Sequence, residues 1–351
     1  MISPKNYTQS LYNRDWSKYD LQYVFLLILS LFLLYIIDSP GVWIKSFIVC
    51  IFAAGLYHPT TRIFFLPFLP IACWLVLFYS CRFIPGSKRP HIYVSVLPAL
   101  ENTLYGDNLS TIVSMHTNVF KDILAWFPYG VLHFMLPFFT SLGLWWFGPP
   151  GILTIFAKAF GYMNLAGVLT QLAFPCSPPW YEYVYGMNTP ASYSMPGHAG
   201  GLIRIDELFN FNTYETAFNG SPMVFGAFPS LHSACAIIQT LFISYTLPIS
   251  RPLCLTYVFW IWWACMYLTH HYMVDLVGGG IYAIVTFWFA WNWLPPVNLT
   301  NNSDDSDDNV DGTLLIQNND SNASIPCIEP DVKLFNSNCN EFKVEISNIN
   351  L

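Results

Sequence analysis

Two short motifs in the second half of the chain contain the residue types used in nucleophilic and acid–base chemistry. The first, over residues 228–233, reads FPSLHS and includes His232, and the second, over 269–275, reads THHYMVD. In a helix, His271 and Asp275 would be four residues apart and would share a face. The carboxylate would then accept the proton on Nδ1 of His271 and leave Nε2 facing outward.

An imidazole that a carboxylate holds in one tautomer is a competent nucleophile or base. A second histidine placed opposite it could supply the acid. His232 is the candidate for that second role, whereas His270 lies one residue out of register and is interpreted as structural. The alternative for His232 and His271 is that they are interfacial histidines hydrogen-bonded to loop carbonyls. The favoured interpretation is a centre of two histidines and one carboxylate.

The segments between the two motifs must bring these residues together. His232 and His271 are separated by nearly forty residues, most of them apolar. That length allows one apolar helix to cross a bilayer and a second helix to return. We therefore expect both motifs to lie on the same side of a membrane.

The composition is typical of a polytopic membrane protein. Of the 351 residues, 54% are apolar and 18% aromatic, and only 10% are charged. The formal net charge of −7 says little about partners, because much of the acid lies in the C-terminal tail. The chain has no basic patch that would indicate nucleic-acid binding, and no nucleic-acid partner is expected.

The cysteines argue against a metal site, and the N-terminal region argues against a cleavable signal peptide. Nine cysteines are scattered, mostly inside apolar runs and without a C-x-x-C pair, so they are interpreted as small buried hydrophobic residues. No metal site and no cofactor are predicted. The first apolar run begins after some twenty polar residues and lacks a small-residue cleavage site, so it is interpreted as a retained anchor.

The chain divides into a polar arm (1–20), a transmembrane catalytic domain (21–296) and a polar tail (297–351) that is predicted to be disordered. Eight apolar runs predict an all-α transmembrane bundle with about eight crossings, although the first two runs could instead form one re-entrant pair. Residues 85–127 are mixed in polarity and predict a non-spanning interfacial segment. The runs cover residues 21–37, 42–57, 63–83, 128–147, 151–174, 231–249, 253–270 and 274–294.

Eight crossings would place both termini on one side of the membrane and both motifs on the other. The motif side would also hold an active-site loop, 175–230, which is rich in Pro, Gly, Tyr and Trp. A loop of this length usually has a function. Lys and Arg are spread almost evenly over the two sides, so the positive-inside rule tests this topology only weakly.

The two histidine motifs resemble the last two signature motifs of the type 2 phosphatidic acid phosphatase superfamily of membrane lipid phosphatases and phosphotransferases. The loop adds a closer likeness, in FPCSPPWYE at 174–182 and YSMPGHAGGLIRID at 193–206. These stretches look like the catalytic subunits of fungal inositol phosphorylceramide synthases. The resemblance extends from the first apolar run to about residue 296 and implies a type 2 phosphatidic acid phosphatase-like core.

The resemblance implies a role for each residue of the centre. His271 would be the nucleophile, Asp275 its orienting carboxylate, and His232 the general acid and base. The enzyme would move phosphoinositol from phosphatidylinositol to ceramide, releasing diacylglycerol through a phosphohistidine intermediate. It would lie in the Golgi membrane with its active site facing the lumen, and a small regulatory membrane subunit would be its partner.

Two other function classes stay open at this point. A lipid phosphate phosphatase would use the same histidines and carboxylate with water as the acceptor. A transporter or scaffold would place the histidines in a pore or an interface, and charged residues deep in several spans would favour it. Few such residues are present.

The chain departs from the superfamily at a position that matters for phosphate binding. Related soluble phosphatases have Ser-Arg where this chain has Ala264-Cys265, so another cation must neutralise the phosphoryl oxygens. Arg204 in the loop is the candidate, and its alternative is a salt bridge to Asp206 or Glu207. Arg82 and Arg89-Pro90 imitate the superfamily's first motif but lie two crossings too early, and that likeness is attributed to chance.

The loop also contains a cluster of aromatic residues whose role the sequence leaves open. Trp180, Tyr181 and Tyr185 are interpreted as an aromatic belt at the level of the lipid headgroups. Direct contact with inositol is the alternative. His198, in the same loop, is given no chemical role.

Overall fold

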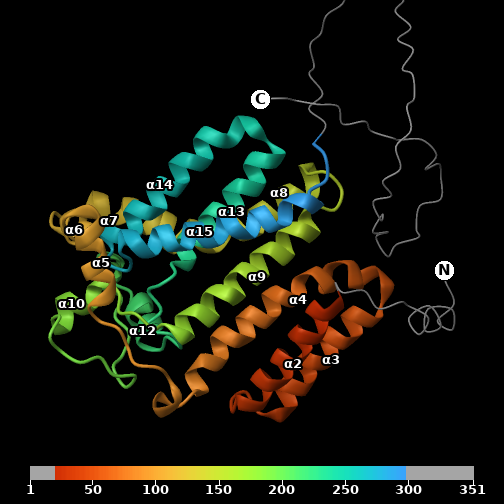
Figure 1. Ribbon diagram of the computed structural model, residues 1–351, viewed down its shortest axis with the longest axis horizontal. Coiled ribbons are helices and arrows are strands. Elements are labelled where there is room, and N and C mark those ends of the chain that lie inside the picture. The colour runs from red at the N-terminus through yellow and green to blue at the C-terminus, as the bar shows by residue number, and fades with distance from the viewer. Residues whose placement is uncertain (1–19, 298–351) are drawn as a thin grey trace, which may run out of the picture. The chain divides into compact units, whose positions relative to one another are not determined.

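The computed structural model describes residues 20–297, and within that range it is all-helical (Figure 1). The only extended pairings there are isolated bridges that join Cys176 to Tyr93 and Gly226. The predicted all-α class is therefore confirmed. The predicted arm before residue 20 and the predicted tail after residue 297 lie outside the described residues.

Within residues 20–297, eight long helices form where the eight apolar runs predict them. Six short helices lie in the polar segments between them. The long helices are α2 (Leu21–Ile36), α3 (Val42–Tyr57), α4 (Pro59–Ser80), α8 (His133–Phe147), α9 (Ile152–Ala173), α13 (Leu231–Thr246), α14 (Arg251–Tyr267) and α15 (Met273–Ala290). The short helices are α5 (Val96–Tyr105), α6 (Leu109–Ser114), α7 (Val119–Trp126), α10 (Pro179–Tyr185), α11 (Ile203–Phe209) and α12 (Thr213–Asn219).

Only some of the long helices meet the length and composition needed to cross a bilayer. Within the described residues, four helical segments qualify: Pro59–Phe83, Val119–Phe147, Ile152–Ala173 and Met273–Trp293. The helices α2 and α3 are apolar but have 16 residues each. A 16-residue helix is about 24 Å long, against about 30 Å of hydrocarbon. The predicted count of eight crossings is therefore not confirmed.

One predicted boundary is wrong. The helix that contains α8 begins at Val119 and passes through α7 and a π-helical turn, η4 (Phe127–Leu132), before it reaches His133. Residues 119–127 thus belong to a candidate span instead of an interfacial segment. They are apolar enough to continue the helix, and Asn118 caps it by accepting a hydrogen bond from the Lys121 backbone N–H at 2.9 Å.

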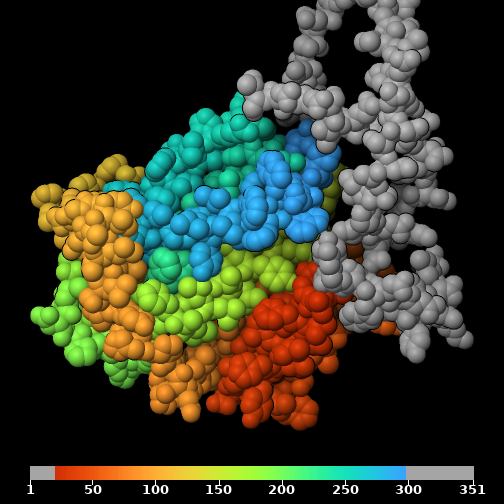
Figure 2. All heavy atoms as spheres, in the orientation of Figure 1, coloured from red at the N-terminus to blue at the C-terminus, as the bar shows by residue number. Residues whose placement is uncertain are grey.

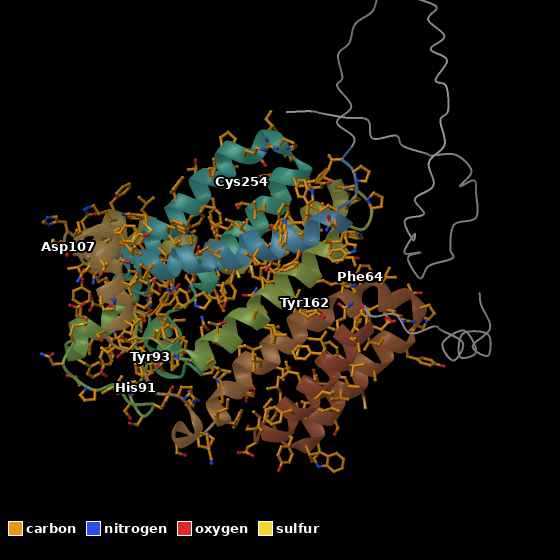
Figure 3. All side chains as sticks on the ribbon, viewed as in Figure 1. Phe64, His91, Tyr93, Asp107, Tyr162 and Cys254 are labelled. Carbon is orange, nitrogen blue, oxygen red and sulfur yellow. The ribbon has the colours of Figure 1, made fainter. Side chains whose placement is uncertain are left out.

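The short helices gather at one end of the long-helix bundle, around the ends of α13, α14 and α15 that carry the two motifs (Figure 1). The N-terminal helices α2 and α3 pack on α4, which in turn lies along α9 (Figures 1 and 2). Tyr162 lies on α9 beside this junction (Figure 3), and its hydroxyl donates to Gln22 Oε1 at 3.1 Å. The helices α2, α3 and α4 therefore pack against the rest of the bundle mainly through α9.

A close approach of α13 and α15 sets the position of the motifs. A Cβ atom on Gly279 of α15 would collide with the carbonyl oxygen of Ser230, so only glycine lets the two helices meet there. The Ser233 hydroxyl donates to the Leu276 carbonyl at 2.6 Å, and Trp262 Nε1 of α14 donates to the same hydroxyl oxygen at 2.8 Å. Three helices are thus joined at the end that carries the histidines.

Candidate active site

The first motif forms the N-terminus of α13. Ser230 is the N-cap, and its hydroxyl oxygen accepts a hydrogen bond from the Ser233 backbone N–H at 3.3 Å. The Ser230 backbone N–H in turn donates to the carbonyl oxygen of Asp275 at 2.9 Å. These bonds hold His232, the second residue of the helix, against the start of α15.

The second motif does not adopt the predicted helical register. The helix α14 ends at Tyr267 and α15 begins at Met273, so His271 lies in the turn between them. The backbone N–H groups of His270 and His271 both donate to the Cys265 carbonyl, at 3.0 and 3.3 Å. The contact expected from helical spacing is nevertheless present, because this turn leads into a helix whose first turn carries Asp275.

The three residues of the predicted centre are in direct contact. His271 Nδ1 lies 2.6 Å from Asp275 Oδ2, and His271 Nε2 lies 3.2 Å from His232 Nδ1. Asp275 is fully buried and His271 is 6% exposed. These distances place the two motifs side by side at one end of the helices that connect them.

The hydrogen-bond network assigns the proton on each ring. A carboxylate can only accept, so His271 Nδ1 carries a proton and its Nε2 has a free lone pair. His232 Nδ1 must then be the donor in the bond between the rings. The arrangement has an acid proton on one imidazole aimed at a lone pair on the other, which suits a nucleophile paired with a general acid.

Two aromatic rings that the sequence interpretation missed pack on His232. The Tyr129 ring stacks on it at a centroid distance of 4.3 Å, and the His133 ring lies 4.3 Å away at an angle of 36°. Both come from the π-helical turn and the residue after it. π-bulges often occur at functional sites. A histidine inside an apolar run is the signal that could have pointed to His133.

His270 has a structural environment, as predicted from its register. Its ring is sandwiched between Tyr129 and Phe218, and its Nε2 lies 3.0 Å from the Ala199 carbonyl oxygen. Burial, with a smaller contribution from nearby His271, lowers the pKa of His270 to about 3. The ring is therefore neutral near pH 7 and donates one hydrogen bond from Nε2.

Glu101 of α5 is a second residue that the sequence interpretation missed. Its fully buried carboxylate accepts hydrogen bonds from the backbone N–H groups of Met273 at 3.1 Å and Val274 at 3.0 Å. These are the unpaired donors at the start of α15, where the helix dipole also favours negative charge. Nothing near Glu101 in the sequence indicates this contact, because the partners lie 172 and 173 residues away.

Arg204 pairs with neither of its predicted acidic neighbours. Its Nε and Nη2 both lie 2.8 Å from Asp122 Oδ1, and its guanidinium lies over the Tyr267 ring at 5.5 Å. Asp206 instead accepts backbone N–H groups at the start of α12. Within residues 20–297, Arg204 forms no hydrogen bond with His232, His271 or Asp275. It is near the turn that carries His271, but it does not touch the triad.

The other predicted cations and aromatic residues also have defined positions. Arg89 donates to the carbonyl oxygens of Cys81 and Ile84 near the end of α4, consistent with a chance likeness to the superfamily motif.

The aromatic-belt interpretation is wrong for Trp180 and Tyr181, which are 3% and 0% exposed. The loop folds back onto the protein, and the Trp180 backbone N–H donates to the Thr269 carbonyl at 2.9 Å, so these rings pack inside.

A family model and several curated relatives match the chain. A model of the PAP2 superfamily matches residues 96–289, which include all three residues of the centre. The inositol phosphorylceramide synthase catalytic subunit of Schizosaccharomyces pombe is 52% identical over 289 residues, or 82% of this chain and 68% of that protein.

Two other relatives have similar names. The inositol phosphorylceramide synthase of Candida albicans is 45% identical over 82% of this chain and 61% of its own length. The inositol phosphorylceramide synthase catalytic subunit of Saccharomyces cerevisiae is 47% identical over 81% of this chain and 70% of its own length. No solved structure matches the chain significantly.

Proposed function

The chain belongs to the inositol phosphorylceramide synthase family within the PAP2 superfamily, and we propose that it transfers phosphoinositol from phosphatidylinositol to the primary hydroxyl of ceramide. The products would be inositol phosphorylceramide and diacylglycerol. The observation that carries the mechanism is the line of contacts from Asp275 through His271 to His232, with one proton between each pair. No metal is assigned a step.

In the first step, His271 Nε2 attacks the phosphorus of phosphatidylinositol. The bond from phosphorus to the diacylglycerol oxygen breaks, and His232, acting as an imidazolium with both ring nitrogens protonated, transfers its Nδ1 proton to that oxygen and becomes neutral. Asp275 keeps the Nδ1–H of His271 in place and stabilises the positive charge that develops on the ring. Because His271 Nε2 lies 3.2 Å from His232 Nδ1, the two rings must separate to admit the phosphoryl group between these atoms.

In the second step, the ceramide hydroxyl displaces His271. The neutral His232 takes the hydroxyl proton as the oxygen attacks phosphorus, and the bond from phosphorus to His271 Nε2 breaks. Both histidines then return to their starting protonation states. A single histidine thus serves as acid and then base, as microscopic reversibility requires of a double displacement.

Arg204 is the proposed phosphate-binding cation. Its support is its place beside the 268–271 turn and the orientation imposed by Asp122. A guanidinium has five N–H donors, and Asp122 engages only one edge of it. The exposed part of the guanidinium, whose side chain is 32% exposed, would bind phosphoryl oxygens that approach His271 from that side.

We also propose a membrane topology and a cellular location for the protein. About eight crossings, with both termini on one side, would put the catalytic end in the lumen of the Golgi. Four helical segments long enough to span support a multi-pass membrane protein, and tilt or local thinning of the bilayer would accommodate the shorter ones. A small regulatory membrane subunit is the proposed partner.

A lipid assay separates this function from the phosphatase alternative. Purified protein in detergent–lipid micelles is incubated with inositol-labelled phosphatidylinositol, with and without ceramide. A transferase yields a labelled sphingolipid and turns over only when ceramide is present. Equal release of water-soluble inositol phosphate without ceramide would identify a phosphatase and contradict the proposal.

A further inference from the structure

A cleft of about 250 Å³ opens beside the turn that carries His271. Its lining includes an indole ring, a phenol ring, two aliphatic hydroxyls, an imidazole and a guanidinium. They come from four separate segments of the chain, which meet at the end of the bundle where the short helices gather. These residues are Ser114, Trp180, Tyr183, His198, Arg204 and Thr269.

Thr269, which lines the cleft, has a strained backbone. Its φ of 62° lies in the left-handed region, which is rare for a β-branched residue. The conformation is held by bonds from Thr269 N–H to the Met266 carbonyl and from Trp180 N–H to the Thr269 carbonyl, both 2.9 Å. Such strain clusters at functional sites and binding clamps.

The Thr269 hydroxyl is available to a ligand. Within residues 20–297 it forms no hydrogen bond, although it is only two residues from His271. Gly200, which also lines the cleft, has a φ of 52°, and a Cβ there would lie 2.8 Å from Thr269 Oγ1. Glycine at this position therefore keeps the space beside the hydroxyl open.

One wall of the cleft carries the positive charge of the Arg204 guanidinium. Asp122 orients Arg204, whose side chain is 32% exposed and lines the cleft. On another wall, the Ser114 and Tyr183 hydroxyls lie 3.1 Å from each other. The cleft therefore combines flat aromatic surface with several hydroxyl and N–H groups around a cation, and it contains no acidic side chain among its lining residues.

We propose that this cleft binds the polyhydroxylated ring of the donor lipid's headgroup and so orients its phosphate toward His271. The ring hydroxyls would bond to the Thr269 and Ser114 hydroxyls, the ring face would lie on Tyr183, and the phosphate would lie toward Arg204. A headgroup ring fits the volume, and the acyl chains would stay outside in the lipid. The inference rests on the proposed function, because it names the subsite of the same donor.

The kinetic test compares Thr269→Val, which keeps the branched shape but removes the hydroxyl, with Thr269→Ser, which keeps the hydroxyl. Tyr183→Leu removes the aromatic face, and Tyr105→Leu alters an exposed tyrosine outside the cleft as the control. We expect Thr269→Val and Tyr183→Leu to raise the KM for phosphatidylinositol about five- to tenfold each, as for one lost hydrogen bond or ring contact. Tyr105→Leu should leave it unchanged, and Thr269→Ser should raise it much less than Thr269→Val does. The KM for ceramide should stay constant in all four variants.

A binding test does not depend on turnover. Glycerophosphoinositol is added to His271→Ala protein in detergent, and saturation transfer to its ring protons is measured by nuclear magnetic resonance. The signal should be strong, should fall when Tyr183→Leu is added, should persist with Tyr105→Leu, and should resist competition by inorganic phosphate.

Three results would overturn the proposal: an unchanged KM for phosphatidylinositol in both cleft variants, a rise in the KM for ceramide alone, or saturation transfer that is equal or absent in all three proteins. Failure of the proposed function would look different. The unmodified protein would then make no labelled sphingolipid, while the binding result would still report on the cleft.

Discussion

The protonation of two ring nitrogens determines what the centre can do. With Asp275 accepting from His271 Nδ1, the lone pair on Nε2 and the proton on His232 are set before any substrate arrives. A change that removes the carboxylate leaves the ring free to adopt the wrong tautomer. The rate should then fall even though the histidine is still present.

Replacement by alanine should lower phosphoinositol transfer far more at His232, His271 and Asp275 than at their neighbour His270. His271→Ala, His232→Ala and Asp275→Ala should each lower phosphoinositol transfer by about 10⁴-fold or more, since replacing the carboxylate of a Ser-His-Asp triad already lowers kcat by about that factor. His270→Ala should retain most turnover per folded molecule, since that ring contacts Ala199 and two aromatic rings instead of the reacting atoms. Transfer rates and thermal unfolding of the four proteins test this. An active His271→Ala with a dead His270→Ala would contradict the assignment.

Arg204 should act mainly on the transition state. If it stabilises charge that grows on the phosphoryl oxygens, Arg204→Ala should lower kcat about 10²- to 10³-fold and change affinity for phosphatidylinositol much less. Arg204→Lys should recover only part of the lost kcat, because the point charge of an ammonium cannot replace the two-pronged hydrogen bonding of a guanidinium. Arg251→Ala, at an exposed position on α14, is the control.

The competing explanation for Arg204 is a purely structural ion pair with Asp122. In that case, Asp122→Asn would lower kcat as much as Arg204→Ala, and both would lower the unfolding temperature. Comparing kcat and thermal unfolding of the two variants decides between these roles.

At the level of elements, the start of α15 is the part of the fold on which the centre depends most. It carries Asp275, follows His271 directly, and is bonded to α13 by Ser230 and to α5 by Glu101. The sequence predicted that an apolar hairpin brings the motifs together, because that follows from run length alone. It could not predict the Glu101 contact, which depends on how a distant short helix packs.

Glu101→Ala should lower both stability and activity, because Glu101 holds the start of α15, which carries Asp275. Loss of the acceptor for two buried N–H groups should destabilise the fold by about 1–3 kcal/mol and lower kcat with little change in either KM. Glu101→Gln, which keeps an acceptor oxygen, should recover part of both losses. Glu207→Ala, at an exposed position on α11, is the matched control. Full activity and stability in Glu101→Ala would show that α15 does not need this cap.

Helical registers were harder to predict than helical positions. The long helices follow the apolar runs closely, because burial and lipid contact both select continuous apolar segments. The His271–Asp275 contact is real, but it forms across the start of a helix and not along one. The π-helical turn before His133 and the pairing of Arg204 with Asp122, 82 residues away, depend on tertiary packing that no local pattern shows.

For the whole molecule, the described residues 20–297 contain every group to which the mechanism gives a step. The PAP2 match also ends before the tail, at residue 289. A protein truncated after Val297 should therefore keep most of its transfer activity. Activity per mole of purified protein, measured with and without the tail, tests this, and complete loss in a well-expressed truncated protein would contradict it.

Trapping the covalent intermediate shows whether His271 attacks phosphorus. Protein is incubated with inositol-labelled phosphatidylinositol without ceramide, denatured rapidly in alkali to preserve phosphorus–nitrogen bonds, and analysed by peptide mass spectrometry. We expect phosphoinositol on the His271 peptide, its loss when ceramide is added, and none in His271→Ala. Transfer to ceramide without any label on the protein, or label that persists in His271→Ala, would contradict it.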